Sequence, residues 1–233
     1  MLSRPQLKHL LLQASTPPAR RLVALFHGLG GSLHELRHVA ERWSAALPST
    51  AFLLLEAPDR DYYARELLSG QWSGDWYRYP KLRSEFGADE QAYVQMAERC
   101  ISERCDHVST ELDDHLATLG LENEQLVLAG FSQGAAVSAY TGLRRGCLGV
   151  LPLGGPCPPR PNLLPENSVT RVCCVVGDAD PFAPHEEIQR CLAKYPPRDD
   201  ASGVKVVAGQ SHVVSEQSIR IGLRFLEESC GCT

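Results

Sequence analysis

The amino-acid sequence predicts an α/β fold, a mainly parallel sheet with helices on both faces. Two observations lead to this expectation. Short apolar runs, typical of strands buried on both sides, alternate with longer segments whose apolar residues recur at helical spacing. No linker, internal repeat or low-complexity tract interrupts the 233 residues, so one core is expected. The sequence therefore predicts a single domain over residues 1–233, without a large cap domain and with a flexible tail at 229–233.

The predicted elements alternate in chain order. Apolar runs indicate strands near residues 7–12, 22–26, 51–55, 126–129, 147–151, 171–176 and 204–208. Helical periodicity indicates helices near residues 34–46, 89–118, 133–145, 185–194 and 215–228. In the first of these helices, for example, Leu36, Val39 and Trp43 share one side, with charged residues between them. The order predicts an opening antiparallel strand beside otherwise parallel strands.

The first two strands lie in a stretch that has a second interpretation. Residues 1–34 contain no Asp or Glu but several basic residues, a composition that faintly resembles a transit peptide. The alternative is an opening strand at 7–12, a turn at Pro17-Pro18 and a strand that begins at Leu22. We favour the strands, because both runs are apolar and a proline pair suits the turn between them.

The strand at 126–129 leads into the most informative motif of the chain, Gly130-Phe-Ser-Gln-Gly134, which opens the helix at 133–145. A Gly-x-Ser-x-Gly turn between a strand and a helix lifts one serine hydroxyl above the sheet edge as a nucleophile. Glycines flank the serine because side chains there would collide with neighbouring backbone. Ser132 is therefore the candidate nucleophile.

Later strands supply the base and the carboxylate that a serine nucleophile needs. The strand at 171–176 precedes a loop with Asp178 and Asp180, and the strand at 204–208 precedes a loop with His212. The order serine, acid, histidine is the one expected when the serine lies on such a turn. Aspartates in a Gly-Asp-x-Asp-Pro stretch are also ordinary turn formers, and the order alone leaves both aspartates as candidates.

A glycine-rich loop, His27-Gly-Leu-Gly-Gly-Ser32, follows the strand at 22–26. Such a loop can turn a backbone amide toward the nucleophile, and the residue after the serine, Gln133, supplies a second amide for an oxyanion hole. A tight strand–helix connection is the alternative. A phosphate-binding loop is not indicated, since neither Gly-Lys-Ser/Thr nor Gly-x-Gly-x-x-Gly is present.

Four segments together resemble the acyl-protein thioesterase group of the phospholipase/carboxylesterase family, whose members are α/β-hydrolases. The segments are His27-Gly-Leu-Gly-Gly-Ser32, Gly130-Phe-Ser-Gln-Gly-Ala135, Gly177-Asp-Ala-Asp-Pro181 and Gly209-Gln-Ser-His212. The similarity runs from about Leu7 to Leu226, nearly the whole chain.

The resemblance assigns roles to single residues. It implies Ser132 as nucleophile, Asp180 rather than Asp178 as acid, and His212 as base. It places the oxyanion amides at Leu29 and Gln133. It also implies esterase or thioesterase activity without a metal or an organic cofactor.

Substrate-binding residues are expected chiefly in the aromatic-rich segment 56–88, which should overhang the nucleophile. Aromatic side chains there would wall a channel for an acyl chain, and the alternative is a loop packed on itself. The candidates are Trp72, Trp76, Leu67, Leu68 and Phe182. The family pattern differs at two places that border its acyl pocket. These are Trp76-Tyr-Arg-Tyr79, where the family has a Trp-Phe-Asp-type stretch, and Leu151-Pro-Leu-Gly-Gly-Pro156, where it often has Ser-Gly.

Composition excludes several other classes of function. The net charge is −5 and no basic run is present, so nucleic-acid partners are not expected. No apolar stretch is long enough to span a bilayer, and no cysteine spacing matches a zinc site. Nine cysteines, an odd number, suit reduced thiols and a cytoplasmic location better than a disulfide framework.

These observations favour a serine hydrolase that cleaves an ester or thioester bond. By resemblance, the substrate is a long-chain acyl group on a protein cysteine or a lysophospholipid, and transient membrane contact is compatible with either. A short-chain carboxylesterase is the alternative enzyme. A hydrolase-like receptor with little turnover is the alternative of another class, because fold alone does not establish activity. A monomer or a weak homodimer is expected.

Overall fold

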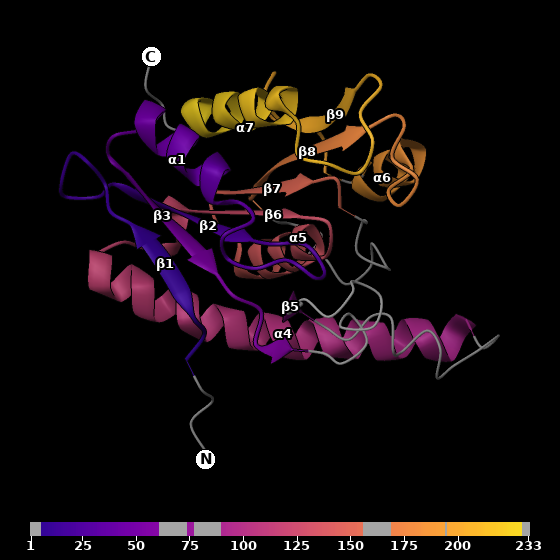
Figure 1. Ribbon diagram of the computed structural model, residues 1–233, viewed down its shortest axis with the longest axis horizontal. Helices are drawn as coiled ribbons and strands as arrows, with labels where there is room; N and C mark the ends of the chain where they lie inside the picture. The colour runs from indigo at the N-terminus through magenta and orange to yellow at the C-terminus, as the bar shows by residue number, and fades with distance from the viewer. Residues whose placement is uncertain (1–5, 61–73, 77–89, 156–168, 194, 230–233) are drawn as a thin grey trace.

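One seven-stranded sheet organises the molecule (Figure 1). The computed structural model describes residues 6–60, 74–76, 90–155, 169–193 and 195–229. The strand order is β1-β3-β2-β6-β7-β8-β9, in which β1 is antiparallel to β3 and every other pair is parallel. Strand bounds are β1 His9–Leu12, β2 Arg21–Phe26, β3 Thr50–Leu55, β6 Leu126–Phe131, β7 Gly149–Leu153, β8 Arg171–Gly177 and β9 Gly203–Val207. The predicted mainly parallel sheet with an antiparallel opening strand is confirmed.

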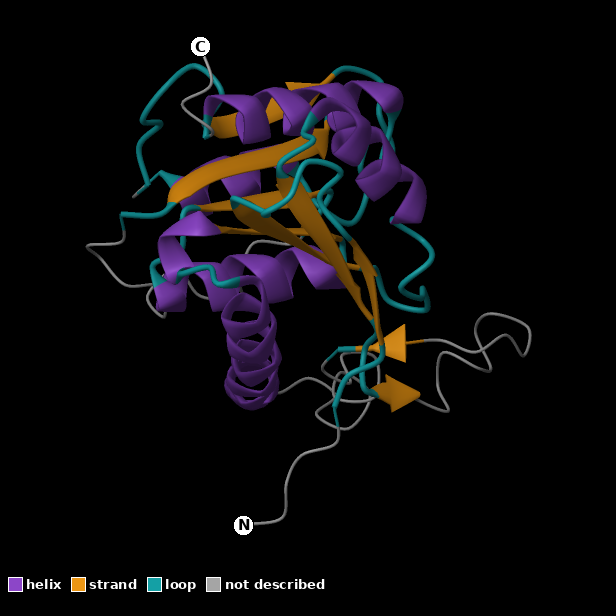
Figure 2. Ribbon diagram, turned by 90° about the vertical axis from the view of Figure 1, so that its left-hand side faces the viewer, coloured by secondary structure: helices purple, strands orange, loops and turns teal. Residues whose placement is uncertain are grey.

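Helices cover both faces of the sheet, as Figure 2 shows. Helices α1 (Arg37–Ala46) and α7 (Glu216–Glu228) lie on one face. The other face carries α4 (Glu90–Leu119), α5 (Gln133–Arg145) and α6 (His185–Leu192). A 3₁₀ turn, η1 (Asn123–Gln125), precedes β6. The single-domain α/β fold expected from the alternating elements is therefore present.

The core lies in two layers because strand side chains alternate between the faces. In β2, Leu22, Ala24 and Phe26 belong to the apolar cluster under α4, α5 and α6, whereas Val23 and Leu25 belong to the cluster under α1 and α7. These side chains are all essentially buried, which explains the continuous apolar runs of the sequence.

Most boundaries agree with the sequence to within three residues. The strand expected at 147–151 spans 149–153, and the helix expected at 34–46 begins at Arg37. A short antiparallel pair, β4 (Asp59–Arg60) and β5 (Gly74–Asp75), was not expected within the aromatic-rich segment. The expected tail lies almost wholly outside the described residues, which end at position 229.

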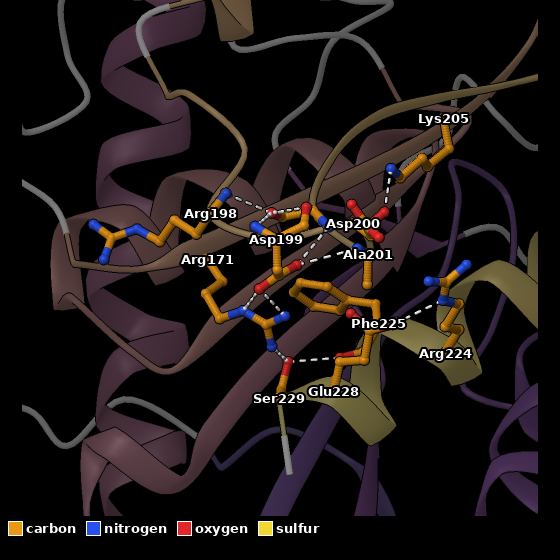
Figure 3. Close-up of polar contacts among 11 residues, drawn as sticks. Arg171, Arg198, Asp199, Asp200, Ala201, Lys205, Arg224, Phe225, Glu228 and Ser229 are labelled. Carbon is orange, nitrogen blue, oxygen red and sulfur yellow. Dashed lines mark hydrogen bonds and ion pairs between the residues drawn. The ribbon is translucent and has the colours of Figure 1, made fainter. Parts of the chain in front are cut away.

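A polar network closes the sheet edge at which β8 begins (Figure 3). Arg171 donates from Nε to Asp199 Oδ2 at 2.8 Å, and it also binds Ser229 at the end of α7. Its guanidinium lies 5.0 Å from the centre of the Phe225 ring. Arg171 thus joins β8, the loop before β9 and α7 at the edge opposite the loops that follow the strands.

Candidate active site

Ser132 occupies the corner between β6 and α5, where it is the N-cap residue of the helix. Its backbone has φ 53° and ψ −117°, and it is the one non-glycine residue with positive φ in the described part of the chain. A non-glycine residue in such a region costs on the order of 1–3 kcal/mol and persists only where the surroundings enforce it. The corner raises the serine at the carboxyl edge of the parallel strands.

Glycines on each side of Ser132 make this corner possible. A Cβ atom on Gly130 would lie 2.2 Å from the carbonyl oxygen of Gly134. A Cβ atom on Gly134 would lie 2.2 Å from the carbonyl oxygen of Phe26 in β2. Backbone atoms cannot yield as a flexible side chain does, so the start of α5 fits against β2 and β6 only with glycine at both positions.

Three predicted residues form one hydrogen-bond chain at this edge. His212 Nε2 lies 2.9 Å from Ser132 Oγ, and His212 Nδ1 lies 2.8 Å from Asp180 Oδ2. The side chain of Asp180 has no exposed surface, and that of His212 is 18% exposed. Because Asp180 accepts from Nδ1–H, Nε2 is left as the acceptor for the serine hydroxyl proton.

The two aspartates of the loop after β8 have different partners. Asp180 Oδ1 accepts from the backbone N–H groups of Phe182 at 2.9 Å and Ala183 at 3.1 Å, which fixes the carboxylate while Oδ2 faces His212. Asp178 Oδ1 accepts from the backbone N–H of Gly209 at 2.7 Å and so joins this loop to the loop after β9. The geometry therefore distinguishes two residues that chain order left equal.

Two phenyl rings flank the imidazole of His212. The ring centroids of Phe131 and Phe182 lie 4.9 Å and 5.0 Å from that of the imidazole. Phe131 is packed beneath the corner, where a Cβ on Gly28 or Gly154 would lie 3.1 Å from its ring. Phe182 is 73% exposed, so it lies on the solvent side of the His212 imidazole.

Two glutamate side chains hold the glycine-rich loop after β2 and the residue that follows it. Gly28 N–H donates to Glu35 Oε2 at 2.8 Å, and Leu33 N–H donates to Glu56 Oε2 at 2.7 Å. Leu29, which supplies one predicted oxyanion amide, is 37% exposed. The other predicted donor, Gln133, is the first residue of α5, where backbone N–H groups have no partner within the helix.

His27 is buried at the base of this loop in a defined tautomer. Its Nε2 accepts from the backbone N–H of Ala57 at 3.0 Å, so its Nδ1–H donates to the carbonyl of Gly28 at 2.7 Å. Burial lowers the pKa of His27 below 6.5, because the cation would lose its hydration. The neutral imidazole is the form that satisfies both bonds.

The remaining substrate-binding candidates are placed only in part. Trp72, Leu67 and Leu68 lie outside the described residues. Trp76 is fully buried, and its indole N–H donates to the carbonyl of His27 at 2.9 Å. Its predicted contact with substrate stays a prediction. The buried indole also binds the backbone at the start of the glycine-rich loop.

Several residues that support the site were not expected from the sequence. His27, Glu35 and Glu56 all bind backbone of the glycine-rich loop or of the segment beside it. Glu56 offered one signal, because it follows directly on a buried strand that ends at the same sheet edge. Glu35 had no comparable signal, since an acidic residue before a helix is common on any surface.

Two further features of the described residues bear on the kind of site. No group of three or more His, Cys, Asp or Glu side chains there is arranged to hold a metal ion. Each helix in that part of the chain is too short or too polar to cross a bilayer.

Comparison with known proteins gives consistent results. Acyl-protein thioesterase 1 of Mycosarcoma maydis is 29% identical over 176 residues, 71% of each chain. The esterase PE8 structure matches with a TM-score of 0.78 at 22% identity, covering 96% of this chain and 99% of that one. The Bacillus cereus carboxylesterase matches with a TM-score of 0.70 at 15% identity, covering 96% and 94%. Residues 7–230 match the phospholipase/carboxylesterase family, so the chain belongs to that family.

Proposed function

We propose that Ser132, His212 and Asp180 are the catalytic triad of a serine hydrolase that cleaves carboxylic esters or thioesters. The observation that carries the proposal is the continuous chain from Ser132 Oγ through the imidazole to the buried carboxylate, with bonds of 2.9 and 2.8 Å. The strained backbone of Ser132 supports it, because strain of this kind is retained mainly where function requires it. Family membership supports the same reaction class.

The proposed reaction has two steps of acyl transfer. Ser132 Oγ forms a bond to the acyl carbon while His212 Nε2 takes the hydroxyl proton and the carbonyl electrons move to oxygen. When the carbonyl re-forms, the C–S or C–O bond breaks and the leaving thiol or alcohol takes the proton from His212. Water then attacks the acyl-enzyme in the same way, which releases the carboxylic acid and restores Ser132.

The negative oxygen of each tetrahedral intermediate would bind the backbone amides of Leu29 and Gln133. The amide of Gln133 lies at the positive end of α5, where developing negative charge is favoured. Loss of one such donor typically costs about 2.7–4 kcal/mol in the activation barrier. The hydrogen bonds that Glu35 and Glu56 accept from the backbone N–H groups of Gly28 and Leu33 would keep the other amide in place.

For the substrate, we propose a long-chain acyl group, carried as a thioester on a protein cysteine or as a lysophospholipid ester. Exposed apolar side chains gather around the triad: Leu29 on the glycine-rich loop, Phe182 beside Asp180 and Val213 beside His212. An acyl chain is the substrate part that such side chains suit. The name of the Mycosarcoma maydis relative, acyl-protein thioesterase 1, favours the protein thioester.

A short-chain carboxylesterase is the second candidate, favoured by the names of the solved structures of similar fold. A hydrolase-like receptor that binds ligand with little turnover is the third. We further propose cytoplasmic action as a monomer or weak homodimer, with transient contact to a membrane that presents the acylated substrate. The buried thiols of Cys105, Cys147 and Cys173 suit a reducing compartment.

The deciding experiment is hydrolysis of a thioester series that varies only in acyl length, with Ser132→Ala as the blank. A serine-dependent rate that rises toward long chains supports the long-acyl substrate. A maximum at short chains of about two to four carbons refutes it and keeps the triad. Loss of labelling by an active-serine fluorophosphonate in Ser132→Ala, with labelling of the native chain, separates an activated serine from a receptor.

A further inference from the structure

We propose that Trp76 is a positioning residue that holds both amide donors of the oxyanion hole in place at once. The inference rests on the proposed function, and it deepens it by naming a residue whose two N–H groups donate to the segments that supply the amides. It starts from a simple observation: the backbone and the side chain of one residue bind the two separate segments that supply the amides.

The indole binds the first segment. Trp76 Nε1–H donates to the carbonyl oxygen of His27 at 2.9 Å, in a buried position. His27 in turn donates from Nδ1 to Gly28 and accepts from Ala57 at Nε2. His27, two residues before Leu29, is therefore held in two ways. Trp76 binds its backbone carbonyl, and the backbone of Gly28 and Ala57 binds its imidazole.

The backbone binds the second segment. Trp76 N–H donates to Oε1 of Gln133 at 2.8 Å, and this contact is also buried. Gln133 is the residue directly after Ser132, and its own backbone amide is the second proposed donor. This bond adds a side-chain restraint on the first turn of α5, beyond the close backbone packing at Gly130 and Gly134.

A third contact fixes Trp76 itself. Arg104, in the middle of the long helix α4, donates from Nε to the carbonyl oxygen of Trp76 at 2.7 Å. The indole ring has no exposed surface and packs at 5.4 Å from Phe26 and 5.2 Å from His27 between ring centroids. Trp76 is thus held by a helix that takes no part in the site, so it acts as a rigid link and not as a mobile cover.

Consequences for catalysis follow from where the charge develops. Hydrogen bonds to an oxyanion strengthen only in the transition state, so a small displacement of the donors lowers kcat more than it alters KM. Loss of the indole N–H releases the His27 segment while the backbone bond to Gln133 remains, so the two donors are no longer held by one residue. An indole that served packing alone would change the free energy of unfolding and leave the chemistry of the folded enzyme unchanged.

The test is Trp76→Phe, which keeps an aromatic ring and removes the indole N–H. Hydrolysis is measured on a carboxylic ester and on the matched thionoester, in which C=S replaces C=O. Sulfur is a weak hydrogen-bond acceptor, so the thionoester gains little from the oxyanion hole. We expect kcat for the ester to fall about tenfold, kcat for the thionoester to fall less than about twofold, and KM to stay within about twofold.

Trp43→Phe is the matched control. Trp43 is equally buried and its Nε1–H donates to the carbonyl of Ile219 at the same 2.9 Å, but it lies under the opposite face of the sheet. Trp43→Phe should lower the free energy of unfolding by about as much as Trp76→Phe, but it should keep the native ratio of kcat for the ester to kcat for the thionoester. An unchanged ratio in Trp76→Phe, or an equal change in both variants, overturns the proposal.

Arg104→Met provides a second variant if Trp76→Phe folds poorly, because it removes the half-buried donor to the Trp76 carbonyl, together with the contact of Arg104 to His107, and leaves Trp76 itself unchanged. Arg104→Met should lower the ratio of kcat for the ester to kcat for the thionoester by a smaller factor than Trp76→Phe does. A native ratio in this variant counts against the positioning role of Trp76. The proposed function is judged separately by the Ser132→Ala blank. If Ser132→Ala retains the activity, the assignment of the triad is refuted. If Ser132→Ala is inactive while the ester-to-thionoester kcat ratios of the other variants stay native, only the proposed role of Trp76 is refuted.

Discussion

Asp178 and Asp180 lie two residues apart, and a pair of isosteric substitutions tests what their different partners mean. In Asp180→Asn, the amide cannot accept from His212 Nδ1–H with a full negative charge, and its NH2 group favours the wrong imidazole tautomer. We expect kcat/KM on a chromogenic ester to fall by about 10⁴-fold. Asp178→Asn keeps Oδ1 as acceptor for Gly209 N–H, so its kcat/KM should stay within about threefold of native.

Equal losses in the two variants would show that the acid is misassigned or that the loop collapses in both. Thermal unfolding of each variant distinguishes these outcomes, because Asp180→Asn retains an oxygen for the Phe182 and Ala183 amides and should fold normally.

A second test at the residue scale uses the buried imidazole of His27. Its pKa is lowered from 6.5 in the folded chain, chiefly by burial, while the unfolded chain titrates near 6.5. Above that pH both states are neutral and the stabilising contribution is complete. As the pH falls below about 6.5, the unfolded state binds the proton first, so this contribution is lost until the pH reaches the folded pKa.

His27→Gln measures that loss, because its amide oxygen can still accept from the Ala57 N–H but does not titrate. The free energy of unfolding in urea should favour the native chain by more at about pH 8 than at about pH 5. Other titrating groups are common to both proteins and cancel in the difference. A difference that does not change with pH would contradict a buried neutral His27.

At the scale of an element, the contact between α5 and β2 tests whether the serine corner depends on close backbone approach. Gly134→Ala places a Cβ atom 2.2 Å from the carbonyl oxygen of Phe26, so we expect a loss of at least about 3 kcal/mol in the free energy of unfolding. Gly120→Ala is the comparator, because that glycine has φ 66° but no atom within 4 Å of the added Cβ. Its cost should stay near 1–2 kcal/mol, roughly the strain of a left-handed residue.

Calorimetric or urea unfolding of both variants gives this comparison. A Gly134→Ala variant no less stable than Gly120→Ala would mean that the helix can shift away from β2, and that the corner is not held by packing.

Elements such as β2 and α1 could be predicted because local pattern and tertiary environment agree. All five side chains from Leu22 to Phe26 are buried, and a strand that is buried on both faces has a continuous apolar sequence that can be recognised directly. In α1, Val39, Ala40 and Trp43 are buried at the spacing that the sequence shows. The hydrogen-bond chain of the proposed triad was predictable for a related reason: Ser132, Asp180 and His212 each follow a recognisable strand at the same sheet edge.

The links around the site could not be predicted, because they join segments far apart in the chain. Trp76 reaches Gln133 across 57 positions and His27 across 49, and no periodicity records such a pairing. The contact of Trp76 with substrate stays a prediction, but β5 precedes this residue and its buried indole donates to the carbonyl of His27, an orientation that a shared helical face with Trp72 did not predict. Tertiary hydrogen bonding decided the orientation.

At the scale of the whole molecule, the carboxyl ends of the parallel strands carry the candidate active site, and the amino end of β8 carries stabilising contacts. The carboxyl edge holds the serine corner, the acid loop and the base loop, whereas the amino edge of β8 holds Arg171 and its partners (Figure 3). From Arg171 to Gly177 the strand spans about 20 Å at its normal rise per residue. Stabilising contacts can therefore be changed at one edge without moving the groups at the other.

Asp199→Asn tests this separation. Burial opposes ionisation of Asp199, but hydrogen bonds from Arg171 and Ser202 outweigh it and lower the pKa of this carboxyl below 3.8. The carboxylate therefore stabilises the fold above about pH 4, where the unfolded chain is ionised as well, and this contribution is lost as the pH falls through the lower folded pKa. Near pH 7 the variant should lose on the order of 1 kcal/mol, because the guanidinium of Arg171 is largely buried and loses its charged acceptor.

That loss should shrink as the pH is lowered below about 4, and kcat/KM at neutral pH should stay within about twofold of native because the triad lies at the far edge. Urea unfolding at two pH values and ester hydrolysis at neutral pH provide the measurements. A large fall in kcat/KM with the fold intact would mean that β8 transmits displacements along its length to Asp180. The edges would then act as one unit, and the rigid sheet would have to be regarded as part of the catalytic apparatus.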